Sequence, residues 1–298
     1  MKILMKQRNY WRKCNGSIYW YILQSNLEID MSIVLSLYDY TGVAATPWAE
    51  AGHTCYCYDI QHDDTKVEHF KGGGAIHYLN ADLHSYETMA SIFTAFMDAD
   101  VVFAMAFPVC TDLAVSGAAW FKKKGEADPE FQMKASTYAM WCAEIFDDLK
   151  VPYYIENPVS RLSTLWRKPN YKFHPYEYGG YIKEGEEEHP LYPDYIAPSD
   201  AYTKKTCLWT GGKFRMPKKN PVDCESFGFS RQHAKLGGKS MKTKNIRSAT
   251  PRGFAAAVYL TNRPSPCVGV CKLDEDLKCT GCNRTLSEIA NWPKAMVL

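Results

Sequence analysis

The stretch Val101-Val102-Phe103-Ala104-Met105-Ala106-Phe107-Pro108-Val109-Cys110-Thr111-Asp112 decides how we expect this chain to fold. Its six apolar residues after Asp100 are typical of a strand that is buried on both faces of a parallel sheet. Pro108 lacks the backbone N–H that a sheet ladder needs, so the chain turns there. Cys110 then lies in the loop beyond the carboxyl end of the strand, where open α/β sheets bind their ligands.

A second stretch of the same kind is Val151-Pro152-Tyr153-Tyr154, and the loop Ile155-Glu156-Asn157-Pro158 is expected to follow it. A lone cysteine at a strand end is more often a buried core residue than a nucleophile. A carboxylate at the end of a later strand changes that balance, because the carboxyl ends of parallel strands meet at one edge of a sheet. The two stretches therefore predict that Cys110 and Glu156 face a common cavity.

Strand-like and helix-like segments alternate from Met31 onward. Strands are predicted at residues 33–38, 54–58, 76–79, 101–106 and 151–154, and helices at residues 44–51, 86–97 and 129–149. This alternation is typical of parallel βαβ units and predicts a doubly wound α/β sheet with helices on both faces. Because no apolar run approaches the roughly 18 residues needed to span a bilayer, we expect a soluble protein.

Charge and cysteine content limit the classes of protein to which the chain can belong. It has 35 Lys and Arg against 33 Asp and Glu in 298 residues, so any electrostatic binding face must be local. Four of its 11 cysteines lie close together near the end, which indicates a metal site in a reducing cytoplasm rather than a secreted disulfide scaffold.

Residues 1–30 are read as an extension, since their apolar part is short and lacks a cleavage site.

An acidic residue follows each of the first three predicted strands. Asp39 and Gly42 make a tight turn whose backbone can approach a ligand closely. Asp59 would accept hydrogen bonds from the hydroxyls of a ribose, and Asp82 would accept one from an adenine amino group. Each acid alone is more often an ordinary turn residue, but three in succession favour a nucleoside cofactor. The glycine pattern is not G-x-G-x-x-G, which disfavours a nicotinamide dinucleotide.

Taken in order, these segments resemble the motifs of DNA cytosine-5 methyltransferases. The closer likeness is to a compact bacteriophage-type set, in which Cys-Thr-Asp-Leu-Ala-Val-Ser-Gly follows the strand, here residues 110–117. The resemblance covers about residues 31–260 and implies a Rossmann-like, S-adenosylmethionine-dependent methyltransferase sheet in a bacterial or phage-infected cytoplasm. The matching residues are Ser36-Leu37-Tyr38-Asp39-Tyr40-Thr41-Gly42, Asp59, Asp82, Phe107-Pro108-Val109-Cys110 and Glu156-Asn157-Pro158.

The resemblance assigns roles to individual residues. Cys110 is implied as the nucleophile and Glu156 as the group that binds the base edge, with DNA as a duplex from which one cytosine is flipped. S-adenosylmethionine is implied at Tyr38, Asp39, Gly42, Asp59, Asp82 and Pro108. Substrate contacts or their support are implied for Asn157, Pro158, Lys204, Lys205, Arg247 and Arg252.

The chain departs from the family pattern near both motifs. Val109 stands where a second proline is usual before the cysteine, and Val43-Ala44-Ala45 replaces a glycine of the first motif. Asp112 is expected to raise the pKa of the Cys110 thiol if the two side chains lie close together.

A basic segment spans residues 212–246. Such a run is about as often a solvated face as a nucleic-acid contact, and phosphate contacts would make binding fall steeply with salt. The short length of the segment predicts a small recognition region. Its basic residues, with the first beyond it, are Lys213, Arg215, Lys218, Lys219, Arg231, His233, Lys235, Lys239, Lys242, Lys244 and Arg247.

The tail carries Cys267-x3-Cys271 and Cys279-x2-Cys282, a spacing that suits a tetrahedral Zn²⁺ site and, less well, an iron–sulfur cluster. Residues 265–292 also resemble a small bacterial cysteine-rich family of unknown function. We expect a structural metal in this module, or a surface for a protein partner. The predicted division is an extension (1–30), a catalytic core (31–211), the basic segment (212–246), a return to the core (247–262) and the four-cysteine module (263–298).

Three interpretations stay open. The first is a cytosine-5 methyltransferase acting on DNA, and the second is a catalytically weak member of the same fold that binds DNA or a protein. The third is a hydrolase that pairs Cys110 with one of the eight histidines, although no histidine follows a strand in a place that would put it beside the cysteine.

Overall fold

The computed structural model describes residues 32–63, 66–224, 232, 235–237, 240–267, 269–270, 272–282 and 284–290. The predicted extension 1–30 lies outside the described residues. So do Arg231, His233 and Lys239 of the basic segment and Cys271 of the tail.

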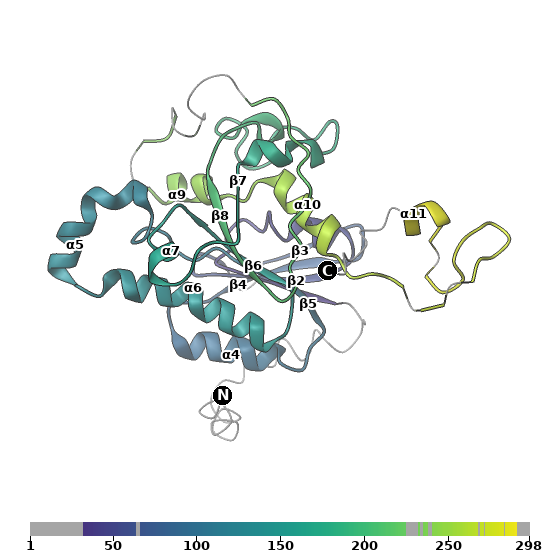
Figure 1. Ribbon diagram of the computed structural model, residues 1–298, viewed down its shortest axis with the longest axis horizontal. Coiled ribbons are helices and arrows are strands. Elements are labelled where there is room, and N and C mark those ends of the chain that lie inside the picture. Colours follow the sequence, from purple (N-terminus) through teal and green to yellow (C-terminus); the bar gives the residue numbers. More distant parts are fainter. Residues whose placement is uncertain are drawn as a thin grey trace.

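One eight-stranded sheet forms the centre of the molecule, with strand order β3-β4-β2-β1-β5-β6-β8-β7 (Figure 1). The strands β4, β2, β1, β5 and β6 run parallel, whereas β3, β8 and β7 each pair antiparallel with a neighbour. The strands are β1 (Ile33–Leu37), β2 (Thr54–Asp59), β3 (Val67–His69), β4 (Ala75–Asn80), β5 (Val101–Ala106), β6 (Tyr153–Pro158), β7 (Tyr171–Phe173) and β8 (Thr206–Gly211).

The order of the strands reverses beside β1. The chain passes from β1 outward through β2 to β4, then returns to place β5 on the other side of β1. Diverging loops at such a reversal leave a crevice at the carboxyl ends of the strands, and ligands of open α/β sheets bind there. The ends of β1 and β5 therefore mark the expected position of the site.

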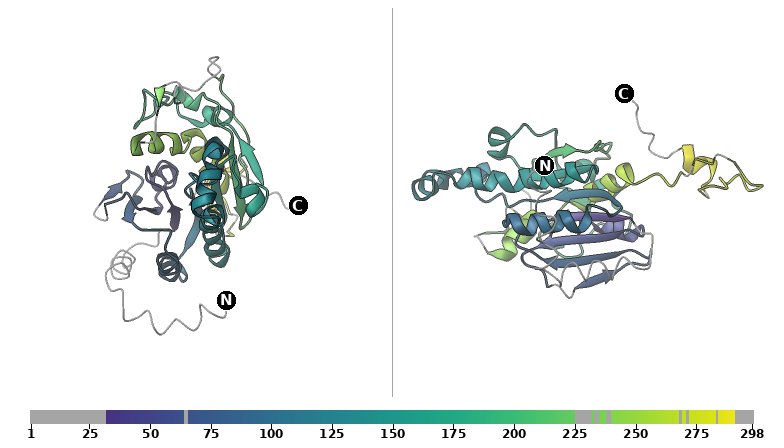
Figure 2. Two further views of the ribbon diagram at one scale, coloured as in Figure 1. Left: turned by 90° about the vertical axis from the view of Figure 1, so that its left-hand side faces the viewer. Right: turned by 90° about the horizontal axis from the view of Figure 1, so that it is seen from below.

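Helices cover both faces of the sheet. Residues of α4 and α6 pack with Leu35 and Leu37 on one face, whereas α3 and α10 pack with Val34 on the other, as strand alternation requires. Figure 1 shows α4 and α6 below the sheet and α10 above it, and the right-hand view of Figure 2 looks onto the α4 and α6 side. The helices are α3 (Thr46–Glu50), α4 (Tyr86–Phe96), α5 (Phe121–Ala127), α6 (Phe131–Asp148), α7 (Leu162–Leu165), α9 (Met241–Ser248), α10 (Arg252–Asn262) and α11 (Leu286–Ala290), with 3-10 turns η2 (Val115–Trp120), η3 (Pro175–Tyr181) and η4 (Pro198–Asp200).

The predicted α/β class is confirmed: a mostly parallel sheet is covered by helices on both faces. One local expectation was wrong. Glu156, Asn157 and Pro158 do not form a loop after β6 but are its last three residues, because β8 pairs with them, Glu156 opposite Leu208 and Pro158 opposite Thr206. No helix within the described residues is long and apolar enough to cross a membrane.

The tail extends away from the sheet after α10 (Figures 1 and 2). Two isolated bridges, Leu273 with Cys279 and Lys278 with Thr285, give it its own local order before α11. The helix α11 buries none of its residues. The division that makes residues 263–298 a separate four-cysteine module stays a prediction.

Candidate functional site

Cys110 and Glu156 come from neighbouring parallel strands. Ala106, the last residue of β5, pairs with Ile155 of β6, so Glu156 lies one step beyond the end of β5. The loop after β5 turns at Cys110, whose carbonyl oxygen accepts hydrogen bonds from Leu113 N (3.0 Å) and Ala114 N (2.8 Å). The charge of Glu156 acts on the Cys110 thiol, so the structure brings the two predicted catalytic residues together.

Asn157 fixes the loop that carries Cys110. Its Nδ2 donates to Pro108 O over 3.0 Å, and the side chain is 1% exposed. Two backbone bonds join the same loops further out, from Val115 N to Val159 O (3.1 Å) and from Arg161 N to Leu113 O (2.8 Å). The buried amide of Asn157, on β6, therefore fixes the position of Pro108, which lies two residues before Cys110 in the loop after β5.

The environment of Cys110 favours the neutral thiol. Burial raises the pKa of its thiol above the ordinary value, and the charge of Glu156 raises it further, whereas the ammonium of Lys204 lowers it. Asp112, which was expected to raise this pKa only if it lay close to the thiol, pairs with Lys124, and Glu156 is the acid that raises the pKa of the Cys110 thiol. Lys204 is thus the charge that favours a thiolate.

Burial also raises the pKa of the Glu156 carboxyl, and Lys204 lowers it. Part of the Glu156 side chain remains accessible, but its Oε1 is buried and has no hydrogen-bond partner in the described part of the chain. A buried oxygen without a partner is costly, so it marks a place where a bound group would be stabilised. A raised pKa suits a carboxyl that holds or donates a proton near neutral pH.

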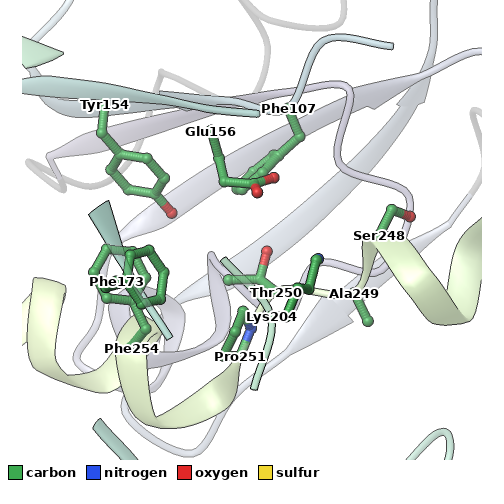
Figure 3. A pocket seen from close by; sticks show the side chains of 10 residues that line it. All are labelled: Phe107, Tyr154, Glu156, Phe173, Lys204, Ser248, Ala249, Thr250, Pro251 and Phe254. Atoms are coloured by element: carbon green, nitrogen blue, oxygen red, sulfur yellow. The ribbon is translucent and has the colours of Figure 1, made fainter. Parts of the chain in front are cut away.

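A cavity of about 10 Å³ lies beside Glu156. Figure 3 shows the carboxylate entering it from the sheet side, with Thr250 and Lys204 on the opposite wall. A space of this size holds about one water molecule. Cys110 is not among the ten residues of its wall, so this cavity alone does not provide the common space for a pyrimidine that the sequence predicted.

Three of the predicted cofactor residues gather at the carboxyl ends of β1, β2 and β4. Tyr38 follows β1 with a φ of 59°, and its hydroxyl donates to Leu83 O over 2.8 Å. Burial raises the pKa of Tyr38, and the charges of Asp82 and Asp59 are further causes. The two acids therefore lie close enough to one tyrosine to act on it electrostatically.

Asp39 and Gly42 shape the turn after β1 instead of facing outward. The Asp39 carboxylate is 3% exposed and accepts hydrogen bonds from Ser36 Oγ (2.7 Å) and Gly42 N (2.9 Å). Gly42 has a φ of 69°, and a Cβ there would meet the Tyr78 hydroxyl. The glycine is required by this turn and by the close approach of Tyr78.

The remaining acids suit a nucleoside. Asp59 Oδ1 accepts from Gln61 N (2.9 Å) and Gln61 Nε2 (3.2 Å), and Asp82 Oδ1 accepts from His84 N (3.0 Å). The Oδ2 atom of each makes no hydrogen bond to a described residue. Each carboxylate thus keeps an acceptor for a hydroxyl or amino group, and the residues present fit the nucleoside part of S-adenosylmethionine.

Of the residues predicted to contact the substrate, some lie beside Glu156 and others lie away from it. Lys204 Nζ donates to Arg247 O over 2.8 Å and lies beside Glu156, whereas Lys205 is exposed. Arg252 donates to Glu186 O (2.7 Å) and Glu187 O (2.6 Å), so it holds that loop. Asn157 donates to the carbonyl oxygen of Pro108, a residue predicted for the cofactor, and Pro158 ends β6.

Part of the basic segment packs on the molecule itself. Lys219 Nζ lies 2.6 Å from Glu177 Oε1, and Lys235 Nζ donates to Asp194 O over 2.7 Å. The helix α9 begins with the Ser240 side chain capping Thr243 N and presents exposed Lys242 and Lys244. The exposed lysines of the described basic segment include Lys213, Lys218, Lys242 and Lys244, and the last two lie together on α9.

The tail cysteines are not assembled around a metal within the described residues. Cys279 Sγ donates to Val270 O over 3.0 Å, and Cys282 Sγ accepts from Arg284 Nε over 3.1 Å, which lowers the pKa of the Cys282 thiol. In the part of the chain that the structure describes, no three His, Cys, Asp or Glu side chains form a group that could hold a metal ion. Cys271 lies outside that part, and Cys267 is exposed.

One comparison with known proteins concerns the tail. A family model described as a protein of unknown function (DUF1289) matches residues 265–296, which confirms the predicted likeness of the module to a family of unknown function. A search of curated proteins finds no match.

Among solved structures, the chain is similar to a presumptive DNA modification methyltransferase encoded within a prophage of E. coli. The two share 12% identity with a TM-score of 0.36 over 64% of this chain, and the match spans about half (53%) of that structure's chain. A likeness of this size carries no argument for the fold or the activity.

Two residues near the site were not found by sequence reasoning. Gln61 contacts Asp59, and Asn245 of α9 contacts Gln61. An isolated glutamine and asparagine belong to no motif, and only the folded chain brings them together.

Proposed function

We propose that the chain transfers a methyl group to C5 of a cytosine in DNA. The observation that carries this proposal is the placing of Cys110 and Glu156 at the ends of two adjacent parallel strands, with Lys204 acting on both. The order of motifs that resembles cytosine-5 methyltransferases supports the same reaction.

The residue types suit the chemistry. Because C5 of cytosine is a poor nucleophile, a thiolate must first add to C6 and convert the ring to an enamine. Cys110 Sγ would form that bond, and Lys204 would favour the thiolate. S-adenosylmethionine, when bound, supplies the methyl group.

Glu156 would act on the other side of the base. Its carboxyl, with a pKa raised by burial, would hydrogen-bond N3 and the amino group and hold the proton that makes the ring accept attack. Loss of the C5 proton and release of Cys110 would then restore the aromatic ring. Flipping the base out of the duplex costs a few kcal/mol, which contacts in the pocket must offset.

The same proposal assigns the binding residues. Tyr38, Asp59 and Asp82 would hold the nucleoside of the methyl donor, and the exposed Lys242 and Lys244 of α9 would contact DNA phosphates.

A second candidate is a catalytically weak protein that binds DNA through the same scaffold. The raised pKa of the Cys110 thiol favours it, because a mostly protonated thiol is a poor nucleophile at neutral pH. This second candidate would make the same contacts with the cofactor and DNA but would transfer few methyl groups.

For the tail we propose a structural Zn²⁺ held by Cys267, Cys271, Cys279 and Cys282, an iron–sulfur cluster being less favoured. The spacing of the four cysteines supports it, as does the lowered pKa of the Cys282 thiol, since metals bind thiolates. The module would then offer a surface to a protein partner.

The decisive experiment follows labelled methyl groups from S-adenosylmethionine into duplex DNA, with mass analysis of the bases. The native chain should produce 5-methylcytosine, Cys110→Ala should produce none, and Cys224→Ala, at a cysteine in the loop after β8, should match the native chain. Cofactor binding without transfer would favour the second candidate. Binding of neither cofactor nor DNA would contradict both.

A further inference from the structure

The helix α9 reaches the cofactor acids through one side chain. Asn245 Nδ2 donates to Gln61 Oε1 over 3.0 Å, although the two residues are 184 positions apart in the chain. Both side chains are partly buried. This bond joins the basic helix to the loop that follows β2.

The bond continues to Asp59. Gln61 donates to Asp59 Oδ1 through both its backbone N and its Nε2. Because a carboxylate only accepts hydrogen bonds, the amide of Gln61 must turn its NH₂ to Asp59 and its oxygen to α9. Asn245 must then donate from its own NH₂ to that oxygen. The polarity of the whole chain of bonds is thus set by the charge of Asp59.

The two bonds hold one oxygen of Asp59 and leave the other available. A carboxylate that accepts from ribose hydroxyls binds more tightly when its orientation is fixed before the ligand arrives, because less freedom is lost on binding. Without Asn245, the Gln61 side chain would keep only one partner and could leave Asp59. The orientation of the acid therefore depends on a residue of α9.

The same helix contacts the catalytic side of the site. The Arg247 carbonyl oxygen, at the end of α9, accepts from Lys204 Nζ, and Lys204 acts on Glu156 and Cys110. One helix, with exposed Lys242 and Lys244 on its surface, is therefore bonded to both halves of the site.

We propose that Gln61 and Asn245 are positioning residues that orient Asp59 toward the ribose hydroxyls of the methyl donor, and that α9 thereby supports the cofactor half of the site. This rests on the proposed function, since it takes Asp59 as the acid that binds the ribose.

The test measures binding of S-adenosylhomocysteine, and of its 2′,3′-dideoxy analogue, to the full chain by calorimetry. The variants are Asn245→Ala and Gln61→Met, the latter keeping the length of the side chain. Met241→Ala, an exposed position on the same helix, is the matched control. Thermal unfolding without ligand checks that each variant is folded.

Loss of one positioning bond should weaken binding of S-adenosylhomocysteine about fivefold in both variants, and in the double variant no further. Binding of the dideoxy analogue should be the same in all variants, because it lacks the hydroxyls that Asp59 accepts from. The Met241→Ala control should bind both ligands like the native chain.

Two outcomes overturn the inference while leaving the proposed function intact: unchanged affinity for S-adenosylhomocysteine in folded variants, or equal weakening for both ligands. If the native chain binds S-adenosylhomocysteine in neither the presence nor the absence of DNA, the proposed function itself fails and the inference fails with it.

Discussion

Replacing Asn157 by alanine should disturb the site through the loop that carries Cys110. The side chain is 1% exposed, and its Nδ2 is 3.0 Å from Pro108 O. The substitution leaves a buried carbonyl oxygen without its donor, which costs about 1–3 kcal/mol. For a chain of this size each kcal/mol lowers the melting temperature by about 2–4 °C.

The loss of transfer should exceed what the loss of stability explains. Displacing Cys110 from its aligned position should slow methyl transfer about 10- to 100-fold, since small misplacements of reacting groups cost that much. Single-turnover transfer and urea unfolding should both be measured well below the melting temperature, so that each variant is folded.

Asn262→Ala is the matched control. Asn262 is 7% exposed and also bridges two segments, with its Nδ2 donating to Arg215 O (2.9 Å) and Val258 O (3.0 Å), away from Cys110. It should lose at least as much stability as Asn157→Ala and keep native transfer. Equal effects of the two variants on transfer, or native transfer in Asn157→Ala, would refute the reasoning.

Three further predictions concern protonation and the tail. Because Lys204 lowers the pKa of the Cys110 thiol, Lys204→Met should move the rising limb of the transfer rate to higher pH; an unmoved limb would show that another group makes the thiolate. Burial raises the pKa of Asp200 to about 6, above the value of about 3.9 expected in the unfolded chain, so the folded state favours the protonated acid. Stability should therefore fall as the pH rises from about 4 to about 6, and Asp200→Asn, which keeps an oxygen for Gly253 N, should remove that fall in urea unfolding. If the tail holds Zn²⁺, a chelator should make residues 265–290 sensitive to protease while the melting temperature of the sheet stays unchanged; release of no zinc would contradict the site.

The sheet could be predicted because its signal is local. An apolar run such as Val101–Ala106 must be buried on both faces, and helices between such runs force parallel connections. Since the ends of parallel strands share one edge, the position of Glu156 beside the end of β5 also followed from the order of the strands, whereas a cavity shared by Cys110 and Glu156 stays a prediction.

The rest depends on partners that are distant in sequence. The strand β6 extends through Glu156, Asn157 and Pro158 because β8 pairs with them, and the identity of those three residues does not indicate this pairing. Asp39 was expected to face a ligand, but Ser36 and Gly42 turn its carboxylate inward. Orientation of a side chain is decided by the folded neighbourhood, which a pattern of residue types does not contain.

The central claim is that Cys110 bonds to C6 of a cytosine. A duplex containing 5-fluorocytosine tests it directly, because fluorine cannot leave C5 as a cation and the bond to sulfur persists after methyl transfer. Intact-mass and peptide analysis should find the oligonucleotide attached to Cys110, only when S-adenosylmethionine is present. Formation of 5-methylcytosine in an unsubstituted duplex while the fluorinated duplex gives no adduct, or attachment at another residue, would contradict the account.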